Sequence, residues 1–183
     1  MWEAVPGREE YYYHTFGKKQ PDFNWENPAL RQKLYDMVNW WLDKGIAGFR
    51  VDAITFIKKD PAWQDCPADG GDGLAKCAKV SRNQPGIVDF LRELKENTFD
   101  HYQCVTIAEA PGVAYEELGN FIGEQGYFSM IFDFRYADLD ITSGSEWFKR
   151  VPWTVRDLRD KIMMSQMALQ KHGWSANFIE NHD

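Results

Sequence analysis

The sequence predicts an α/β fold in which helices cover a parallel sheet. Short, largely apolar runs typical of buried strands alternate with amphipathic stretches typical of helices along most of the 183 residues. Both a (β/α) barrel and an open, doubly wound sheet have this order. Neither GxGxxG nor GxxxxGK followed by Ser or Thr comes after any of the runs, so the usual nucleotide-binding signature of the open sheet is absent.

The first elements are a loop, a helix and a strand. Residues 1–20 read as loop because Gly and Pro are scattered among them. A helix is expected after Asn27, which suits an N-cap and is followed by Pro28 at the first helical position. Gly45 ends this helix, and the run 46–54 follows as a short buried strand. The apolar face of the helix contains Leu30, Leu34, Met37, Val38, Trp41 and Leu42.

Further alternation follows a long loop. Residues 58–85 are rich in Gly, Pro, Asp and Lys, and long loops in compact domains are usually functional. A helix with Ile87, Phe90, Leu91 and Leu94 on one face precedes a strand at 103–110. A short amphipathic piece is expected at 115–122 and a strand at 129–134. Thr154 with Asp157 forms a capping box that opens another helix, and 175–183 is a final strand candidate.

Composition excludes several classes of partner. The net charge is −7 and no block of basic residues occurs, which argues against nucleic acid. No run of eighteen apolar residues occurs, so no membrane span is expected, and no signal peptide is visible.

The cysteines Cys66, Cys77 and Cys104 are few and odd in number, which favours a reducing, cytoplasmic location; a Cys66–Cys77 disulfide remains an alternative. The histidines lack zinc spacing, so no metal site is expected.

Charged residues stand at the ends of three predicted strands. Arg50 and Asp52 share one face of the first strand and lie at its carboxyl end. Glu109 ends the second strand, and His182 and Asp183 end the last one. In a parallel barrel this end is where active sites are built. A single carboxylate after a strand is usually a cap or loop residue, and Arg50 with Asp52 could be a structural ion pair. Three such ends in one alternating chain favour a functional site.

Two of these carboxylates suit the cleavage of a glycosidic bond, which needs one ionised and one protonated carboxyl group. The cation of Arg50 would keep Asp52 ionised, as a nucleophile requires. Glu109 has apolar neighbours and no basic residue next to it in the sequence, so burial would favour its protonated form, as a general acid requires. Asp183 and His182 could grip the hydroxyl groups of the sugar.

Four motifs resemble those of a known family. The stretches GFRVDAI, IAEAPG and FIENHD resemble three signature regions of the alpha-amylase family of glycoside hydrolases (family 13). QPDFNWENP resembles an auxiliary region of the oligo-1,6-glucosidase and alpha-glucosidase branch. The resemblance implies a fragment of a (β/α)8 barrel, about strands four to seven. Residues 1–20 would then end a loop domain inserted after strand three, and 21–183 would be a partial catalytic barrel.

The resemblance also implies a role for each strand-end residue. Asp52 matches the nucleophile, Glu109 the general acid/base and Asp183 the aspartate that stabilises the transition state. Arg50 and His182 match the substrate-binding arginine and histidine. The family's first signature, Asp-x-x-x-Asn-His, is absent, and so is the calcium loop that some members carry. No cofactor is therefore expected in this chain, although the complete enzyme could hold calcium.

The resemblance finally implies a substrate. Ala53 follows the predicted nucleophile, and in this branch alanine there goes with α-1,4 preference and valine with α-1,6 preference. The expected activity is retaining hydrolysis of terminal α-glucosidic bonds in short oligosaccharides, with α-1,4 favoured over α-1,6. The alternatives are a transglucosidase or sugar isomerase of the same family, an inactive fragment, or a non-catalytic relative. The sequence makes no prediction of the oligomeric state.

Overall fold

The computed structural model describes residues 1–69, 71–141 and 150–180. The chain forms two compact units. The first unit consists of Met1–Ala47 and Ala53–Gln103. The second unit consists of Gly48–Asp52 and the described residues from Cys104 onward. In the described part of the chain, no helix is long and apolar enough to cross a membrane.

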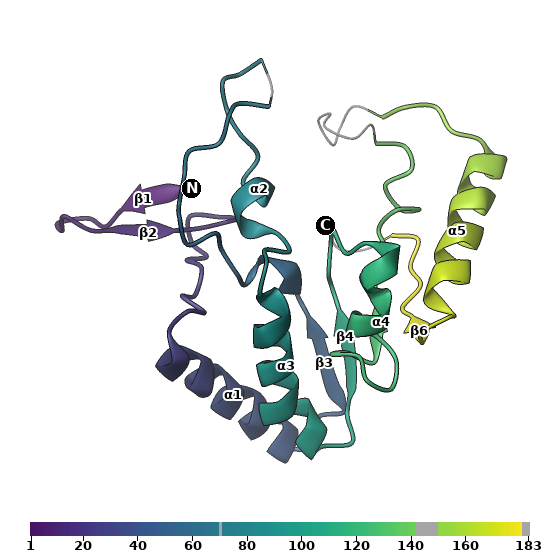
Figure 1. Cartoon of the computed structure of the whole chain (residues 1–183), viewed down its shortest axis with the longest axis horizontal. Helices are drawn as coiled ribbons and strands as arrows, with labels where there is room; N and C mark the ends of the chain where they lie inside the picture. Colours follow the sequence, from purple (N-terminus) through teal and green to yellow (C-terminus); the bar gives the residue numbers. More distant parts are fainter. Residues whose placement is uncertain (70, 142–149, 181–183) are drawn as a thin grey trace. The chain divides into compact units, whose positions relative to one another are not determined.

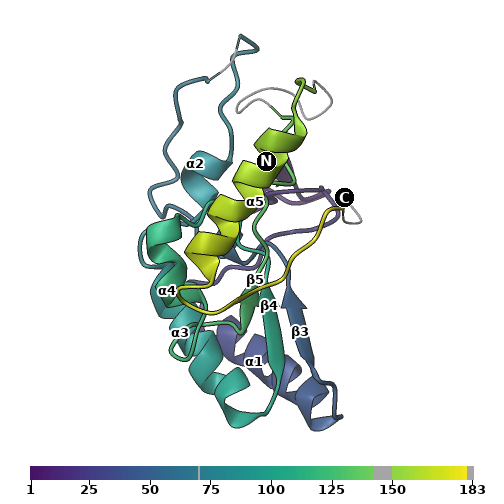
Figure 2. The same ribbon diagram turned by 90° about the vertical axis from the view of Figure 1, so that its right-hand side faces the viewer.

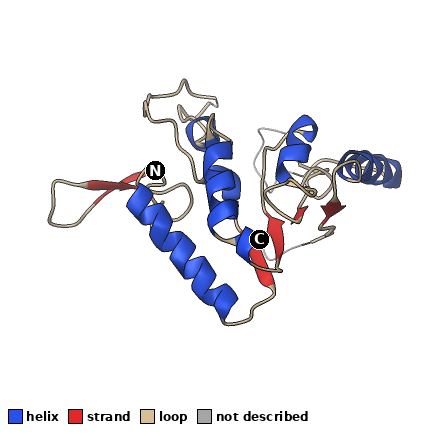
Figure 3. Cartoon of the chain, turned by 60° about the horizontal axis from the view of Figure 1, so that its bottom comes forward, coloured by secondary structure: helices blue, strands red, loops and turns tan. Residues whose placement is uncertain are grey.

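The first unit opens with an antiparallel hairpin of β1 (Trp2–Ala4) and β2 (Tyr11–Tyr13), which Figures 1 and 3 show beside the N-terminus. The prediction of a loop over residues 1–20 is therefore wrong for these two strands, while the rest of the segment is neither helix nor strand. Trp2 pairs with Tyr13 across the strands, with ring centroids 5.3 Å apart. Such cross-strand aromatic pairs stabilise antiparallel strands, and the scattered Gly and Pro concealed this tendency in the sequence.

Helix α1 (Pro28–Asp43) confirms the prediction of a helix capped by Asn27. The Asn27 side chain accepts a hydrogen bond from the Ala29 amide at 3.0 Å, which satisfies one of the donors left free at a helix start. At the other end, the Gly45 amide donates to the Leu42 carbonyl at 2.8 Å. Gly45 has φ of +88°, a conformation that glycine adopts without strain.

The rest of the first unit is mostly loop and helix. The 3-10 turn η1 (Ile54–Phe56) leads into the long loop, which contains the short helix α2 (Ala78–Ser81). Helix α3 (Ile87–Asn97) buries the predicted face, and the turn η2 (Phe99–His101) follows it. The cysteines are free thiols, so the alternative of a disulfide in this loop is not borne out.

The second unit contains a four-stranded parallel sheet, which confirms the predicted sheet type. Its strands are β3 (Gly48–Val51), β4 (Val105–Ala108), β5 (Met130–Ile131) and β6 (Trp174–Ser175), in that spatial order. Figure 2 shows β3, β4 and β5 side by side. Gly48 is required where β3 meets β4, because a Cβ there would lie 1.8 Å from the Val105 carbonyl oxygen.

The last strand differs from the prediction of 175–183. It ends at Ser175, because β5 offers only two residues for pairing, Met130 opposite Trp174 and Ile131 opposite Ser175. Beyond it, the Phe178 amide donates to the Tyr136 hydroxyl at 3.0 Å and not to a strand. The predicted strand is therefore wrong over its described residues 176–180.

The helical elements of the second unit are η3 (Tyr115–Glu117), α4 (Leu118–Phe121) and α5 (Val155–Leu169). The predicted capping box is present at the start of α5, since Thr154 accepts from the Asp157 amide at 3.2 Å and Asp157 accepts from the Thr154 amide at 2.7 Å. Apolar side chains from the sheet, these helices and the segment between α4 and β5 are buried in this unit: Ala108, Leu118, Phe121, Ile122, Phe128, Ile131 and Leu169.

Candidate active site

The carboxyl ends of β3 and β4 lie next to one another. Val51 pairs with Ala108 in the parallel register, and the Glu109 amide donates to the Val51 carbonyl at 2.9 Å. Asp52 and Glu109 each follow the last residue of their strand, so they leave the sheet at the same level. This confirms the expectation that the first two strand ends meet at one edge.

Arg50 contacts both carboxylates. Its Nη1 lies 3.3 Å from Asp52 Oδ1, and its Nη2 forms an ion pair with Glu109 Oε2. No basic residue stands next to Glu109 in the sequence, but the parallel pairing of β3 and β4 brings Arg50 to it. The register explains the contact, because Arg50 pairs with Ile107, and Glu109, two residues further on and directly after β4, continues that face. The Arg50 guanidinium is thus in contact with two carboxyl groups.

The two carboxylates differ in exposure. The Asp52 side chain is 72% exposed, whereas that of Glu109 is 13% exposed. The Arg50 side chain is 34% exposed. The Arg50–Asp52 pair is therefore not buried, although it belongs to a strand that was predicted to be buried. The two carboxylates thus stand in different surroundings although both contact Arg50.

Aromatic rings adjoin this cluster, and the sequence analysis did not single them out. The Arg50 guanidinium carbon lies 6.0 Å from the centroid of the Phe132 ring, and Phe132 follows β5 directly. Phe178 packs edge-on against both Phe132 and Phe134, with centroids 5.4 and 5.1 Å apart. The signal for these residues was the pattern IFDF, in which aromatic side chains alternate across a strand end.

The remaining predicted site residues are only partly described. Ala53 has φ of +41° and ψ of +38°, a left-handed conformation that is uncommon for a residue with a side chain. Such strain occurs most often at functional sites. His182 and Asp183 lie outside the described residues, so their places in the site stay predictions. Among the residues described, no group of three His, Cys, Asp or Glu could hold a metal ion.

Sequence comparison relates the whole chain to enzymes. A family profile described as "Alpha amylase, catalytic domain" matches residues 1–183. The probable oligo-1,6-glucosidase 3 of Bacillus subtilis (strain 168) is 46% identical over 188 residues, and an alpha-glucosidase of Pediococcus pentosaceus is 35% identical over 185 residues. These matches cover 100% of this chain and 32% and 33% of the relatives. The chain thus spans about a third of the length of these relatives.

Solved structures agree with the sequence matches. A trehalulose synthase variant in complex with Tris has a TM-score of 0.86 at 32% identity. A variant of trehalose-6-phosphate hydrolase from Bacillus licheniformis has a TM-score of 0.85 at 30% identity. Both comparisons cover 100% of this chain and 32% of the solved one. The prediction of a partial (β/α)8 barrel is confirmed.

Proposed function

Because the chain belongs to the alpha-amylase family of catalytic domains, we propose that it is part of a retaining glycoside hydrolase. Its substrates are short oligosaccharides, from which it removes terminal α-glucosyl units through a covalent glucosyl-enzyme. The observation that carries this proposal is the position of Arg50 between Asp52 and Glu109. A single arginine shared by an open and an enclosed carboxylate suits a reaction in which the two acids exchange their charge states.

The first step of the proposed reaction uses Asp52 as the nucleophile. Its carboxylate oxygen forms a bond to the anomeric carbon while the bond from that carbon to the leaving oxygen breaks. Glu109 gives its proton to the leaving oxygen and becomes a carboxylate. In the second step Glu109 takes a proton from water, the water oxygen bonds to the anomeric carbon, and the ester to Asp52 breaks. Asp183 and His182 are proposed to hold the same sugar.

Arg50 has a task in both steps of this scheme. Before the first step Asp52 is the anion, and a neighbouring guanidinium stabilises its charge. In the glucosyl-enzyme Asp52 is a neutral ester and Glu109 is the anion. Arg50 contacts both groups in the structure, so it can stabilise whichever one is charged without leaving its strand.

The bond that is cleaved and the acceptor that receives glucose are the finer part of the proposal. Ala53, directly after Asp52, supports α-1,4 over α-1,6 linkages. A relative named oligo-1,6-glucosidase keeps α-1,6 as the alternative. Transfer to a sugar acceptor is the second candidate function, because a trehalulose synthase is among the similar structures.

We place the protein in the cytoplasm and expect it to act without a cofactor. An inactive fragment and a non-catalytic relative remain the contrary outcomes.

Glucose release tests this proposal. The chain, and the longest polypeptide that its reading frame encodes, are each incubated with maltose and with isomaltose. Glucose is expected from maltose in preference to isomaltose, and Asp52→Asn is expected to lower the rate by roughly 10⁴-fold, because the covalent step is lost. Ordinary turnover in the variant would exclude Asp52 as nucleophile. Consumption of maltose with formation of a new disaccharide and no free glucose would favour transfer over hydrolysis.

A further inference from the structure

A buried carboxylate lies just beyond β5 in the second unit, outside the cluster described above. Asp133 is 5% exposed. Its Oδ2 accepts a hydrogen bond from the Tyr115 hydroxyl at 2.9 Å, and its Oδ1 accepts from the amide and from Nη1 of Arg135 at 3.1 and 3.0 Å. Both carboxylate oxygens are thus satisfied, as a buried charge requires.

Arg135 extends these contacts to the segment that follows Glu109. Its Nη2 donates to the Val113 carbonyl, and its guanidinium carbon lies 4.0 Å from the centroid of the Tyr115 ring. Asp133 and Arg135 therefore hold residues 113 and 115 at three points: a carbonyl, an aromatic face and a hydroxyl. We call Tyr115, Asp133 and Arg135 the loop clamp.

The loop clamp holds one end of a short loop whose other end is fixed by the sheet. Glu109 stands at the near end, where its amide is bound to Val51 of β3. Ala110 and Val113 are buried, and Gly112 turns the chain with φ of +86°. The side chain of Glu109 thus emerges from a loop that is held at both ends.

Stability alone is a weak reason for the loop clamp. Asp133 is buried, whereas the Arg135 side chain is 40% exposed, so solvent weakens the attraction that has to offset the desolvation of the carboxylate. What an ion pair with directed hydrogen bonds adds is one defined geometry. That property matters where a neighbouring acid has to meet a leaving oxygen, since a displacement of about 1 Å can cost about 10²-fold in rate.

We propose that Tyr115, Asp133 and Arg135 are positioning residues that hold Glu109 in the place where it transfers its proton. This inference rests on the proposed function and goes beyond it, because it assigns three residues that touch neither Asp52 nor Arg50 in any described contact. They act through the loop between Glu109 and Tyr115.

The protonation state of the Tyr115 hydroxyl suits its role as a hydrogen-bond donor in the loop clamp. Burial raises the pKa of the Tyr115 hydroxyl, and the neighbouring Asp133 carboxylate raises it further. The hydroxyl therefore keeps its proton at neutral pH and remains a donor to Asp133.

Leaving-group dependence tests the proposal. The variants are Tyr115→Phe, Asp133→Asn and Arg135→Gln, with Arg159→Gln as the control for a lost positive charge, because Arg159 pairs with Asp160 on the exposed face of α5. With the complete polypeptide, each clamp variant is expected to lose roughly 10- to 100-fold in kcat/KM, which reports the first step, on maltose, whose leaving group is poor. The loss on 4-nitrophenyl α-glucoside, which needs little protonation, is expected to be several times smaller. Arg135→Lys keeps the charge but not the fork of donors, and should lie between wild type and Arg135→Gln.

Two results would overturn the proposal. One is an equal loss on both substrates in folded variants, because a role in proton transfer must depend on the leaving group. The other is a loss no larger than that of Arg159→Gln.

Failure of the proposed function is recognised separately, as wild-type protein that cleaves neither substrate. In that case, amide hydrogen exchange at residues 109–115 decides the positioning role. Exchange is expected to rise in Tyr115→Phe, and unchanged exchange would rule out the loop clamp.

Discussion

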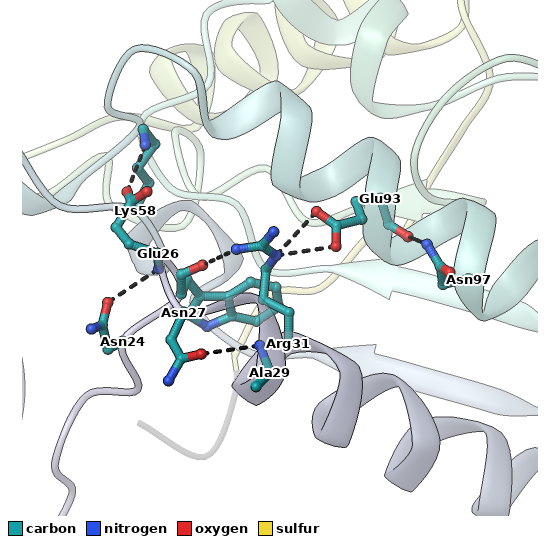
Figure 4. Close-up of polar contacts among 9 residues, drawn as sticks. Asn24, Glu26, Asn27, Ala29, Arg31, Lys58, Glu93 and Asn97 are labelled. Carbon is teal, nitrogen blue, oxygen red and sulfur yellow. Dashed lines mark hydrogen bonds and ion pairs between the residues drawn. The ribbon is translucent and has the colours of Figure 1, made fainter.

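The two units of the molecule use arginine differently. In the first unit, Arg31 of α1 directs Nε to both oxygens of Glu93 on α3, at 3.1 and 3.0 Å, and its Nη1 to the Trp25 carbonyl at 2.6 Å (Figure 4). Its guanidinium also lies 5.0 Å from the centroid of the Phe90 ring, and its side chain is 14% exposed. This arginine has one anionic partner, and its other contacts hold the start of α1 in place.

In the second unit, Arg50 has two carboxyl partners, Asp52 and Glu109, instead of one. Asp52 is largely exposed and Glu109 is enclosed, and one positive charge cannot neutralise both. In the proposed reaction only one of the two is an anion at each stage, so the single guanidinium serves them in turn. The comparison teaches that an arginine with one anionic partner can join two helices, whereas an arginine shared by two carboxylates at adjacent strand ends suits the proposed reaction.

Removal of the enclosed carboxylate is the strongest way to break this comparison. Glu109→Gln keeps the shape of the side chain but cannot give or take a proton. The rate on maltose is expected to fall by roughly 10²- to 10⁴-fold, because protonation of a poor leaving oxygen is lost. The first step on an activated aryl glucoside should be affected far less, and this is measured as the burst of released phenol. Equal losses on both substrates would show that Glu109 is not the acid, and would place it beside Glu93 as a structural carboxylate.

The matching change in the first unit, Glu93→Gln, is expected to lower the stability of the protein and to leave its activity unchanged. Glu93→Gln weakens the contact with Arg31 and should lower the free energy of unfolding by about 1 kcal/mol, since the pair is partly exposed. Glu96→Gln, on the same helix and exposed, is the control for the lost charge. Unfolding in denaturant measures the effect, and the rate on maltose is expected to be unchanged. A large loss of activity without a loss of stability would contradict the division between the two arginines.

The sequence predicted the Arg50–Asp52 contact, but neither the Arg50–Glu109 pair nor the Arg31–Glu93 pair. Arg50 and Asp52 are two residues apart on a strand, so alternation alone places them on one face, and the strand order brings Glu109 beside them. Arg31 and Glu93 are 62 residues apart on two helices, and their meeting depends on how those helices pack, which no periodicity encodes.

Other features escaped the sequence for related reasons. The β1–β2 hairpin was missed because aromatic pairing outweighed the loop-forming residues around it. The last strand was placed too late because its length is set by its neighbour β5. The loop clamp was missed because Tyr115 and Asp133 are joined by a side-chain contact between two loops that follow different strands.

The smallest expected effect concerns Asp157, a carboxylate of the second unit whose hydrogen bonds come from Thr154. The Thr154 hydroxyl and amide bind the Asp157 carboxylate and lower its pKa. A lowered pKa in the folded state means that the carboxylate stabilises the protein above the unfolded pKa of about 4, and that this contribution is lost as pH falls through the folded value.

Asp157→Asn should therefore be less stable than wild type at pH 6, and the difference should shrink as the pH falls below the unfolded pKa of about 4. Denaturant unfolding across this range measures it, with Asp160→Asn on the same helix as the control. A difference that stays constant with pH would mean that the capping box contributes through hydrogen bonds that do not depend on the charge. Asp157 would then stabilise the protein whether charged or neutral, in contrast to the carboxylates that contact Arg50.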